Sequence, residues 1–214
     1  MTKAIIFDLD GVIIDTERTV WLTSSINLLA LYNKTHEAEK VEHMLYGSKF
    51  EDGTRIMYGY YDISDSFENF LDKRRKFVYK GFAENVDFME GFEDFFKRLT
   101  KNKKAIATSM DTQFLQLTLQ HLLLKSFFGS HIYTIADSGG RGKPHPDIFL
   151  YAADKLGQDP ADCIVIEDAP KGIAAAKSAG MKAIGITKSV SADKLVQADC
   201  VVDSFEEISD EMLL

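Results

Sequence analysis

Short apolar runs that alternate with helical patterns constrain the fold of this chain more than any other feature of its sequence. Six such runs lie at residues 3–7, 104–107, 131–135, 163–166, 183–186 and 200–202. Helical patterns separate most of them, and the clearest are residues 146–156, followed by Gly157, and residues 170–179, followed by Gly180. Strands that alternate with helices favour a parallel sheet covered on both faces. The sequence therefore predicts an α/β fold with a doubly wound, Rossmann-like parallel sheet.

Residues 16 to 80 interrupt this alternation, because they contain no apolar run of the β type. Two helical stretches occupy the segment instead, at residues 20–32 and 67–79, and each carries apolar side chains at helical spacing. Since this segment follows the first strand, we expect it over the carboxyl-terminal edge of that strand. The prediction divides the chain into a core domain and an inserted all-α helical-bundle domain, at residues 1–15 with 82–214 and at residues 16–81.

The charge of the chain limits its partners. The formal net charge is −8 at pH 7, so the overall field repels anions and nucleic acid is not an expected partner. No apolar run approaches the roughly 18 residues of a membrane span. Asp8 and Asp10 also interrupt the first apolar run, unlike the pattern of a signal peptide. We therefore expect a cytoplasmic protein with neither a membrane nor a nucleic-acid partner. We also expect a monomer, although no feature of the sequence carries that expectation.

Two carboxylates follow the first apolar run, in the sequence Asp8-Leu9-Asp10-Gly11-Val12. Residues i and i+2 of a strand share a face, so the spacing predicts that the side chains of Asp8 and Asp10 lie side by side. Close like charges are costly unless a cation neutralises them or one takes up a proton, which makes the pair a candidate metal site or acid/base pair. An ordinary Asp-Gly turn at the end of a strand explains the same residues.

Three further groups follow later strands or a strand-to-helix connection: Thr108 with Ser109, Lys143, and Glu167 with Asp168. Each has a plain explanation by itself, a helix cap for the hydroxyls and the acidic pair and a solvated surface position for the lysine. Together they carry more weight, because ligands bind at the carboxyl ends of the strands in an open parallel sheet. Carboxylates, hydroxyls and an ammonium at that edge suit a hard divalent cation that bridges to a phosphate.

The joint pattern resembles the haloacid dehalogenase superfamily, in its branch of β-phosphoglucomutases and phosphoglycolate phosphatases, and the resemblance covers nearly all of the chain. Its four motifs correspond to residues 8–12, residues 108–109, Lys143 within 142–147, and residues 167–168. The helix after the last motif, at residues 169–181, is also typical of this branch. The resemblance implies that the helical insert is a cap domain, with hinges near residues 15–17 and 80–82.

The resemblance also implies a chemistry and a role for each motif residue. Asp8 would attack phosphorus as the nucleophile, and Asp10 would protonate the leaving oxygen and later deprotonate water. Mg²⁺ would be held by oxygen atoms of four residues, Asp8, Asp10 through its backbone carbonyl, Glu167 and Asp168. The transferring phosphoryl oxygens would be bound by Thr108, the N–H of Ser109 and Lys143. We therefore expect a phosphatase that hydrolyses a small phosphorylated metabolite through an aspartyl-phosphate.

Three other functions stay open at this point. A sugar-phosphate mutase of the β-phosphoglucomutase type tends to carry a histidine after the first motif and a Lys-Gly-x-x-Arg pattern in the cap, and residues 16–20 and 46–50 show neither mark. A dehalogenase lacks the acid at the position of Asp10 and needs no metal. A non-catalytic protein of the same fold would be expected to lack a nucleophile, acid or metal ligand, and all of these are present in the sequence.

Overall fold

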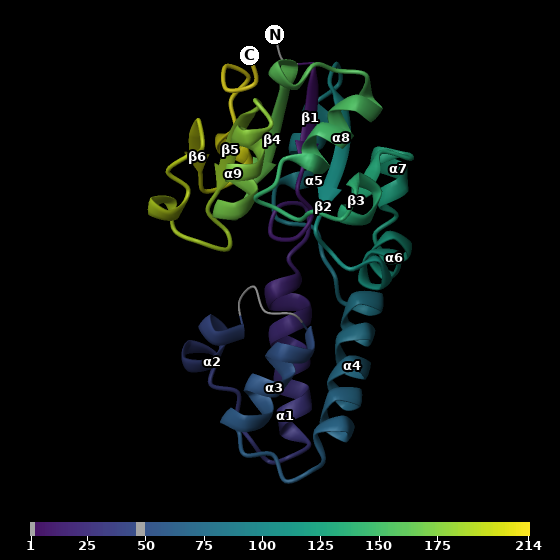
Figure 1. The fold of residues 1–214 in the computed structure, drawn as a ribbon, viewed down its shortest axis with the longest axis vertical. Coiled ribbons are helices and arrows are strands. Elements are labelled where there is room, and N and C mark those ends of the chain that lie inside the picture. The colour runs from purple at the N-terminus through teal and green to yellow at the C-terminus, as the bar shows by residue number, and fades with distance from the viewer. Residues whose placement is uncertain (1–2, 46–49) are drawn as a thin grey trace. The chain divides into compact units, whose positions relative to one another are not determined.

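The chain forms two compact units in a computed structural model that describes residues 3–45 and 50–214 (Figure 1). The units consist of Met1–Asp15 with Asp87–Leu214, and of Thr16–Val86. Residues 46–49, which carry most of the cap stretch compared above with the mutase pattern, lie outside the described residues.

The described residues of the first unit contain one parallel sheet of six strands, in the order β3-β2-β1-β4-β5-β6. The strands are β1 (Ala4–Phe7), β2 (Lys103–Thr108), β3 (Ile132–Thr134), β4 (Cys163–Glu167), β5 (Lys182–Ile186) and β6 (Cys200–Val202). β1 lies between β2 and β4, so the direction of winding reverses beside β1. Such a switch point opens a crevice at the carboxyl ends of the strands. The predicted α/β class with a Rossmann-like sheet is confirmed.

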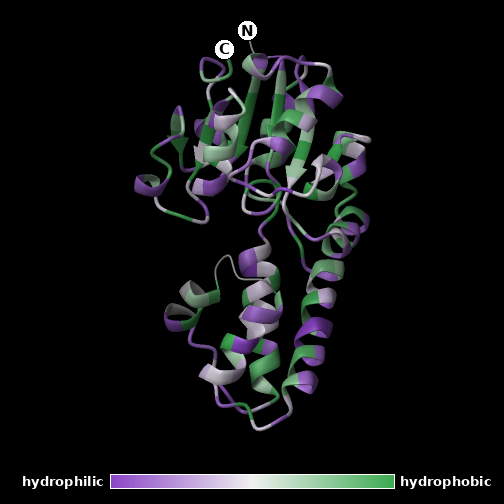
Figure 2. Cartoon of the chain, in the orientation of Figure 1, coloured by the Kyte–Doolittle hydropathy of each residue, from purple (hydrophilic) through white to green (hydrophobic). Residues whose placement is uncertain are grey.

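Helices cover both faces of this sheet. The helices of this unit are α5 (Phe92–Arg98), α6 (Thr112–His121), α7 (Leu124–Phe128), α8 (Asp147–Leu156) and α9 (Pro170–Ser178). Successive side chains of β1 point to opposite faces. Ile6 belongs to the apolar cluster that includes α8 and α9, whereas Phe7 makes edge-to-face contacts with Phe92 and Phe95 of α5. Figure 2 shows these strands as hydrophobic, in keeping with burial on both faces.

The two helices predicted most clearly are confirmed at nearly the expected bounds. α8 begins at Asp147 after Pro146, and Gly157 adopts the left-handed conformation at its end with φ of 62°. α9 begins at Pro170, whose missing N–H would be unpaired in the first turn of a helix. Gly180 follows with φ of 76°. These glycines end the helices because they reach positive φ without steric cost.

The second unit is helical throughout its described regular elements. A π-helical segment (Glu17–Leu22) leads into α1 (Thr23–Ala30), followed by α2 (Ala38–Leu45), α3 (Phe50–Tyr60) and α4 (Phe67–Glu84). Among its described residues, one buried apolar cluster consists of Leu28, Leu29, Val41, Met57, Tyr61, Ile63 and Phe70. The predicted insert ends at residue 81, whereas this unit extends to Val86 because α4 continues to Glu84.

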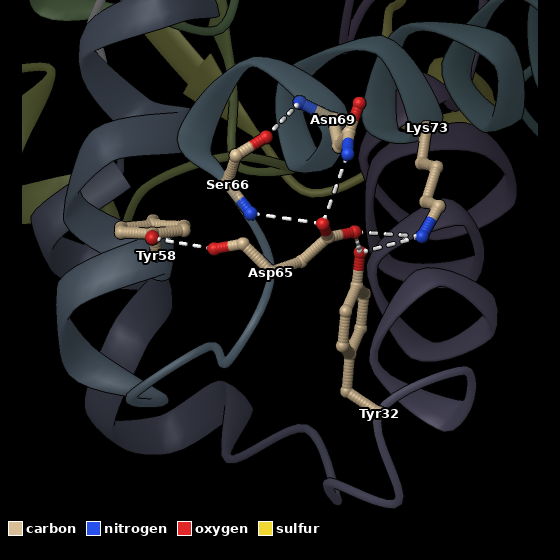
Figure 3. Close-up of polar contacts among 6 residues, drawn as sticks. All are labelled: Tyr32, Tyr58, Asp65, Ser66, Asn69 and Lys73. Atoms are coloured by element: carbon tan, nitrogen blue, oxygen red, sulfur yellow. Dashed lines mark hydrogen bonds and ion pairs between the residues drawn. The ribbon is translucent and has the colours of Figure 1, made fainter.

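A carboxylate cross-links the helices of this unit. Asp65 lies just before α4 and accepts hydrogen bonds from Tyr32, at 3.0 Å, and from Lys73 of α4, at 2.8 Å (Figure 3). Its backbone carbonyl accepts a bond from the hydroxyl of Tyr58 in α3, at 2.6 Å. Ser66 caps α4, since its side chain accepts from the N–H of Asn69. One short segment therefore joins α3, α4 and the turn after α1.

Candidate active site

The first motif lies in a turn at the carboxyl end of the central strand. β1 ends at Phe7, and the N–H of Asp8 bonds to the carbonyl of Ile166 in β4 at 3.0 Å. Asp8 is buried, whereas Asp10 is half-buried and forms a bridge with Ile14. The strand periodicity used to place the two carboxylates side by side thus stops one residue before the pair. Both carboxylates nevertheless emerge at the sheet edge where the predicted crevice lies.

Lys143 connects the first motif to the last. Its Nζ donates to Oδ1 of Asp8 and, at 2.7 Å, to Oε1 of Glu167. All three side chains are buried, with 8%, 10% and 2% of their surfaces exposed for Lys143, Asp8 and Glu167. The sequence predicted that the loop before α8 carries this lysine to the sheet edge. The structure adds that one ammonium bridges two carboxylates from neighbouring strands.

The acidic pair of the fourth motif is buried at the end of β4. Glu167 is its last residue, and Oε2 accepts the N–H of Ala169 at 2.7 Å. Asp168 follows, and its Oδ2 accepts a hydrogen bond from Ser189. Residues 167 and 168 are 1% and 4% exposed. Asp8, Glu167 and Asp168 therefore bring three buried carboxylates to one end of adjacent strands.

The second motif lies at the end of β2, next to β1. Thr108 is the last residue of that strand and is buried, whereas Ser109 is exposed. The hydroxyl of Thr108 accepts the N–H of Met110 at 3.0 Å. In the described part of the chain, neither hydroxyl is bonded to Asp8 or Lys143. The two residues thus lie at the end of the strand next to the carboxylates but outside their hydrogen-bond network.

The charges of the site oppose one another. Burial raises the pKa of Asp8 to about 6, although Lys143 acts to lower it. Burial, followed by the charges of Glu167 and Asp8, raises the pKa of Asp168 well above its usual range. Burial by itself would lower the pKa of Lys143, but the two carboxylates beside it raise that pKa above its ordinary value. Three buried acids against one base leave an excess of negative charge that a cation would neutralise.

Two residues that the sequence reasoning did not assign to the site contact its carboxylates. Ser189 binds Asp168 from the loop after β5. Gly172 in α9 approaches Glu167 so closely that a Cβ atom there would overlap the carboxylate. A serine in a loop has no sequence signal that distinguishes it from other surface serines. Gly172 belongs to the helix at residues 169–181 that is typical of the family. Its position in the sequence does not reveal that it contacts Glu167.

The described residues contain no helix that is both long and apolar enough to cross a membrane.

Comparisons with known proteins place the chain in a family. Residues 2–180 match haloacid dehalogenase-like hydrolases. A probable pseudouridine-5'-phosphatase of Drosophila melanogaster is 33% identical over 213 residues, which cover 96% of this chain and 91% of that protein. A phosphorylated carbohydrates phosphatase of Thermotoga maritima is 30% identical and covers 93% of this chain and 92% of its own.

A solved structure supports the same relationship. The crystal structure of a haloacid dehalogenase family hydrolase from Deinococcus radiodurans, with bound phosphate and sodium, superimposes with a TM-score of 0.83 at 28% identity. The match covers 96% of this chain and 93% of that one. The sequence, the sheet order and the relatives therefore agree on one family. The chain belongs to the haloacid dehalogenase-like hydrolases, as a phosphatase of that family.

Proposed function

We propose that this chain is a magnesium-dependent phosphomonoester hydrolase that acts on a small phosphorylated metabolite through an aspartyl-phosphate on Asp8. The observation that carries the proposal is the buried Asp8 at the switch point of the sheet, bonded to Lys143, which also binds Glu167. A buried carboxylate held by a lysine suits attack on a phosphoryl group whose charge the lysine stabilises.

Asp8 and Asp10 divide the chemistry between them. An Asp8 carboxylate oxygen forms a bond to phosphorus as the bond from phosphorus to the leaving oxygen breaks, and Asp10 gives that oxygen its proton. Asp10 then takes a proton from water, whose oxygen attacks phosphorus and releases Asp8 with inorganic phosphate. The half-buried position of Asp10 favours this exchange of protons with substrate and water.

Thr108, the N–H of Ser109 and Lys143 would bind the transferring phosphoryl oxygens. Lys143 contributes a fixed positive charge, since its buried ammonium has two carboxylate partners that hold it in place. The ends of β1 and β2 are adjacent, because Phe7 pairs with Ile106 two residues before Thr108. Phosphoryl transfer depends mainly on such positioning and charge stabilisation.

The donor set fits a hard divalent cation. Asp8, Glu167 and Asp168 supply carboxylate oxygens, the ligands that Mg²⁺ prefers, and their buried negative charge exceeds that of Lys143. Among the residues that the structure describes, no three side chains of His, Cys, Asp or Glu are already arranged to hold a metal ion by themselves. The backbone carbonyl of Asp10 and water molecules would therefore complete the ligand set. A bound Mg²⁺ supplies charge neutralisation for the phosphoryl oxygens.

The helical unit would select the substrate. It is a separate compact unit joined to the core by two chain crossings, after Asp15 and after Val86, as a cap requires. Two relatives are named for different substrates, pseudouridine 5'-phosphate and phosphorylated carbohydrates. The substrate class of this chain is therefore proposed only as a small phosphomonoester.

Phosphate release from a panel of phosphomonoesters tests the proposal. The panel contains pseudouridine 5'-phosphate, hexose phosphates, phosphoglycolate and nucleoside monophosphates, each with Mg²⁺ and with excess chelator. The parent protein is compared with Asp8→Asn, in which any remaining activity would reveal a contaminating phosphatase. Asp154→Asn, at an exposed position of α8, is the matched control for the substitution itself. We expect release that requires Mg²⁺, is lost in Asp8→Asn and persists in Asp154→Asn.

Rapid acid quenching of the reaction adds a direct readout of the intermediate. Mass spectrometry of the peptide that contains Asp8 should show a covalently bound phosphoryl group in the parent and none in Asp8→Asn. Hydrolysis without this group would contradict the aspartyl-phosphate. If no ester is hydrolysed and a hexose 1-phosphate is isomerised instead, the chain is a mutase. If neither reaction occurs, the hydrolase proposal fails.

A further inference from the structure

Asp168 is held by a hydroxyl group that lies outside the four motifs. The residue is 4% exposed, and Ser189 Oγ donates a hydrogen bond to its Oδ2. Within residues 3–45 and 50–214, this is the one hydrogen bond that the carboxylate accepts. Buried carboxylates are normally satisfied by several donors, so the orientation of Asp168 depends on Ser189 to an unusual degree.

The sheet topology brings this hydroxyl to Asp168. β4 pairs with β5 in a register that places Glu167 opposite Gly185, so the loops that follow these two strands are neighbours. The loop after β5 is anchored by the N–H of Thr187, which bonds to the carbonyl of Val202 in β6 at 3.0 Å. Ser189 is an exposed residue, yet its hydroxyl donates to the buried carboxylate of Asp168.

Gly11 lies against the same oxygen of Asp168 that Ser189 binds. Gly11 adopts φ of 78°, a conformation that L side chains rarely adopt. A Cβ atom at this position would overlap Asp168 Oδ2 and would lie 2.8 Å from Ser189 Oγ. The backbone of the first motif and the serine hydroxyl thus enclose Oδ2. Oδ1 carries no hydrogen bond within the described chain and is the oxygen available to another ligand.

We propose that Ser189 is a positioning residue for the metal site, which binds Oδ2 of Asp168 and thereby presents Oδ1 to the divalent cation. This inference rests on the proposed function, because it assumes that Asp168 is a metal ligand. A hydroxyl donor also stabilises the ionised carboxylate against the nearby charges of Glu167 and Asp8. Partners of this kind, which orient a metal ligand, commonly change metal affinity by about 10-fold to 100-fold when removed.

Direct metal binding tests the proposal without using activity. Isothermal titration of chelator-stripped, full-length protein with Mg²⁺ and with Mn²⁺ compares the parent with Ser189→Ala, Ser189→Thr and Ser191→Ala. Ser191 is the matched control, because it lies in the same loop and its hydroxyl bonds to Asp193. We expect Ser189→Ala to weaken binding about 10-fold, Ser189→Thr to keep the affinity of the parent, and Ser191→Ala to have no effect.

The outcomes separate this inference from the proposed function. Parent-like affinity in Ser189→Ala would overturn the role of Ser189 and leave the metal site intact. Equal losses in Ser189→Ala and Ser191→Ala, or a failure of Ser189→Thr to retain binding, would assign the effect to the loop and also overturn it. A parent protein that binds neither ion would overturn the proposed metal site itself. Circular dichroism of each variant checks that the fold is retained.

Discussion

The substitution Gly172→Ala should destabilise the core, although alanine normally stabilises a helix. Gly172 is buried in α9, and a Cβ atom there would overlap the carboxylate of Glu167. That carboxylate cannot turn aside freely, because Lys143 binds Oε1 and the N–H of Ala169 binds Oε2, each at 2.7 Å. The added methyl group must therefore displace either α9 or Glu167.

The expected cost follows from these contacts. Displacing Glu167 deprives Lys143 of one carboxylate, and breaking a buried ion pair costs about 3–5 kcal/mol. Keeping Glu167 in place overpacks the site, which costs up to about 3 kcal/mol. The higher helix propensity of alanine offsets about 1 kcal/mol of this loss in unfolding free energy. We therefore expect the free energy of unfolding of Gly172→Ala to fall by about 2–4 kcal/mol.

Gly59→Ala is the matched control. Gly59 lies in α3 with nothing within 4 Å of a Cβ atom, so we expect that variant to gain up to about 1 kcal/mol. Urea denaturation measures both, with far-UV circular dichroism for the whole chain and fluorescence of Trp21, the single tryptophan, for the helical unit. A Gly172→Ala protein at least as stable as its parent would refute the predicted overlap with Glu167.

Three further predictions concern charge. Lys73 and other donors hold the pKa of Asp65 well below its usual range, so its contribution to the helical unit is present above about pH 4 and is lost as pH falls through the folded pKa. Asp65→Asn should remove this pH dependence, as measured by Trp21 fluorescence in urea between pH 7 and pH 3. Lys143→Met leaves two buried carboxylates without their cation and should lower the unfolding free energy in chelator by about 3–5 kcal/mol, which thermal denaturation would detect. Mg²⁺ at 100 times its dissociation constant should stabilise the parent by about 2.7 kcal/mol, and Asp168→Asn should lose this gain in a thermal shift assay.

The fold was predictable because its strands are buried on both faces. Such strands appear as short apolar runs, and β1, β4 and β5 lie within a residue or two of the runs in the sequence. The expected end of the helical insert, residue 81, lies within α4, which continues to Glu84. α4 continues through Gly81, where a Cβ atom would lie 2.8 Å from Val20 Cγ1. The absence of a side chain at Gly81 lets α4 pack closely against Val20, and the local sequence of α4 does not reveal this partner.

The site was predictable in its location but not in its contacts. Parallel strands end at one edge, so the positions of Asp8, Thr108 and Glu167 along the chain were enough to group them. The link from Lys143 to both Asp8 and Glu167 depends on the path of a loop, and no periodicity encodes it. Ser189 is a stronger case, because it contacts Asp168 across 21 positions of the chain and belongs to no motif.

The electrostatics of the site connect stability to ligand binding. Asp8, Glu167 and Asp168 are buried together with one ammonium. Burial and the neighbouring carboxylates disfavour the ionised forms of Asp8 and Asp168 in the free protein and raise the pKa of each. A cation removes that penalty only in the folded state, because the unfolded chain does not bring the three carboxylates together. The same repulsion that lowers the stability of the free protein therefore adds to its affinity for a metal. Asp168→Asn should therefore both stabilise the chelator-treated protein and abolish its stabilisation by Mg²⁺. If the variant changed only one of these two properties, the stability of the free protein and its metal affinity would have separate origins.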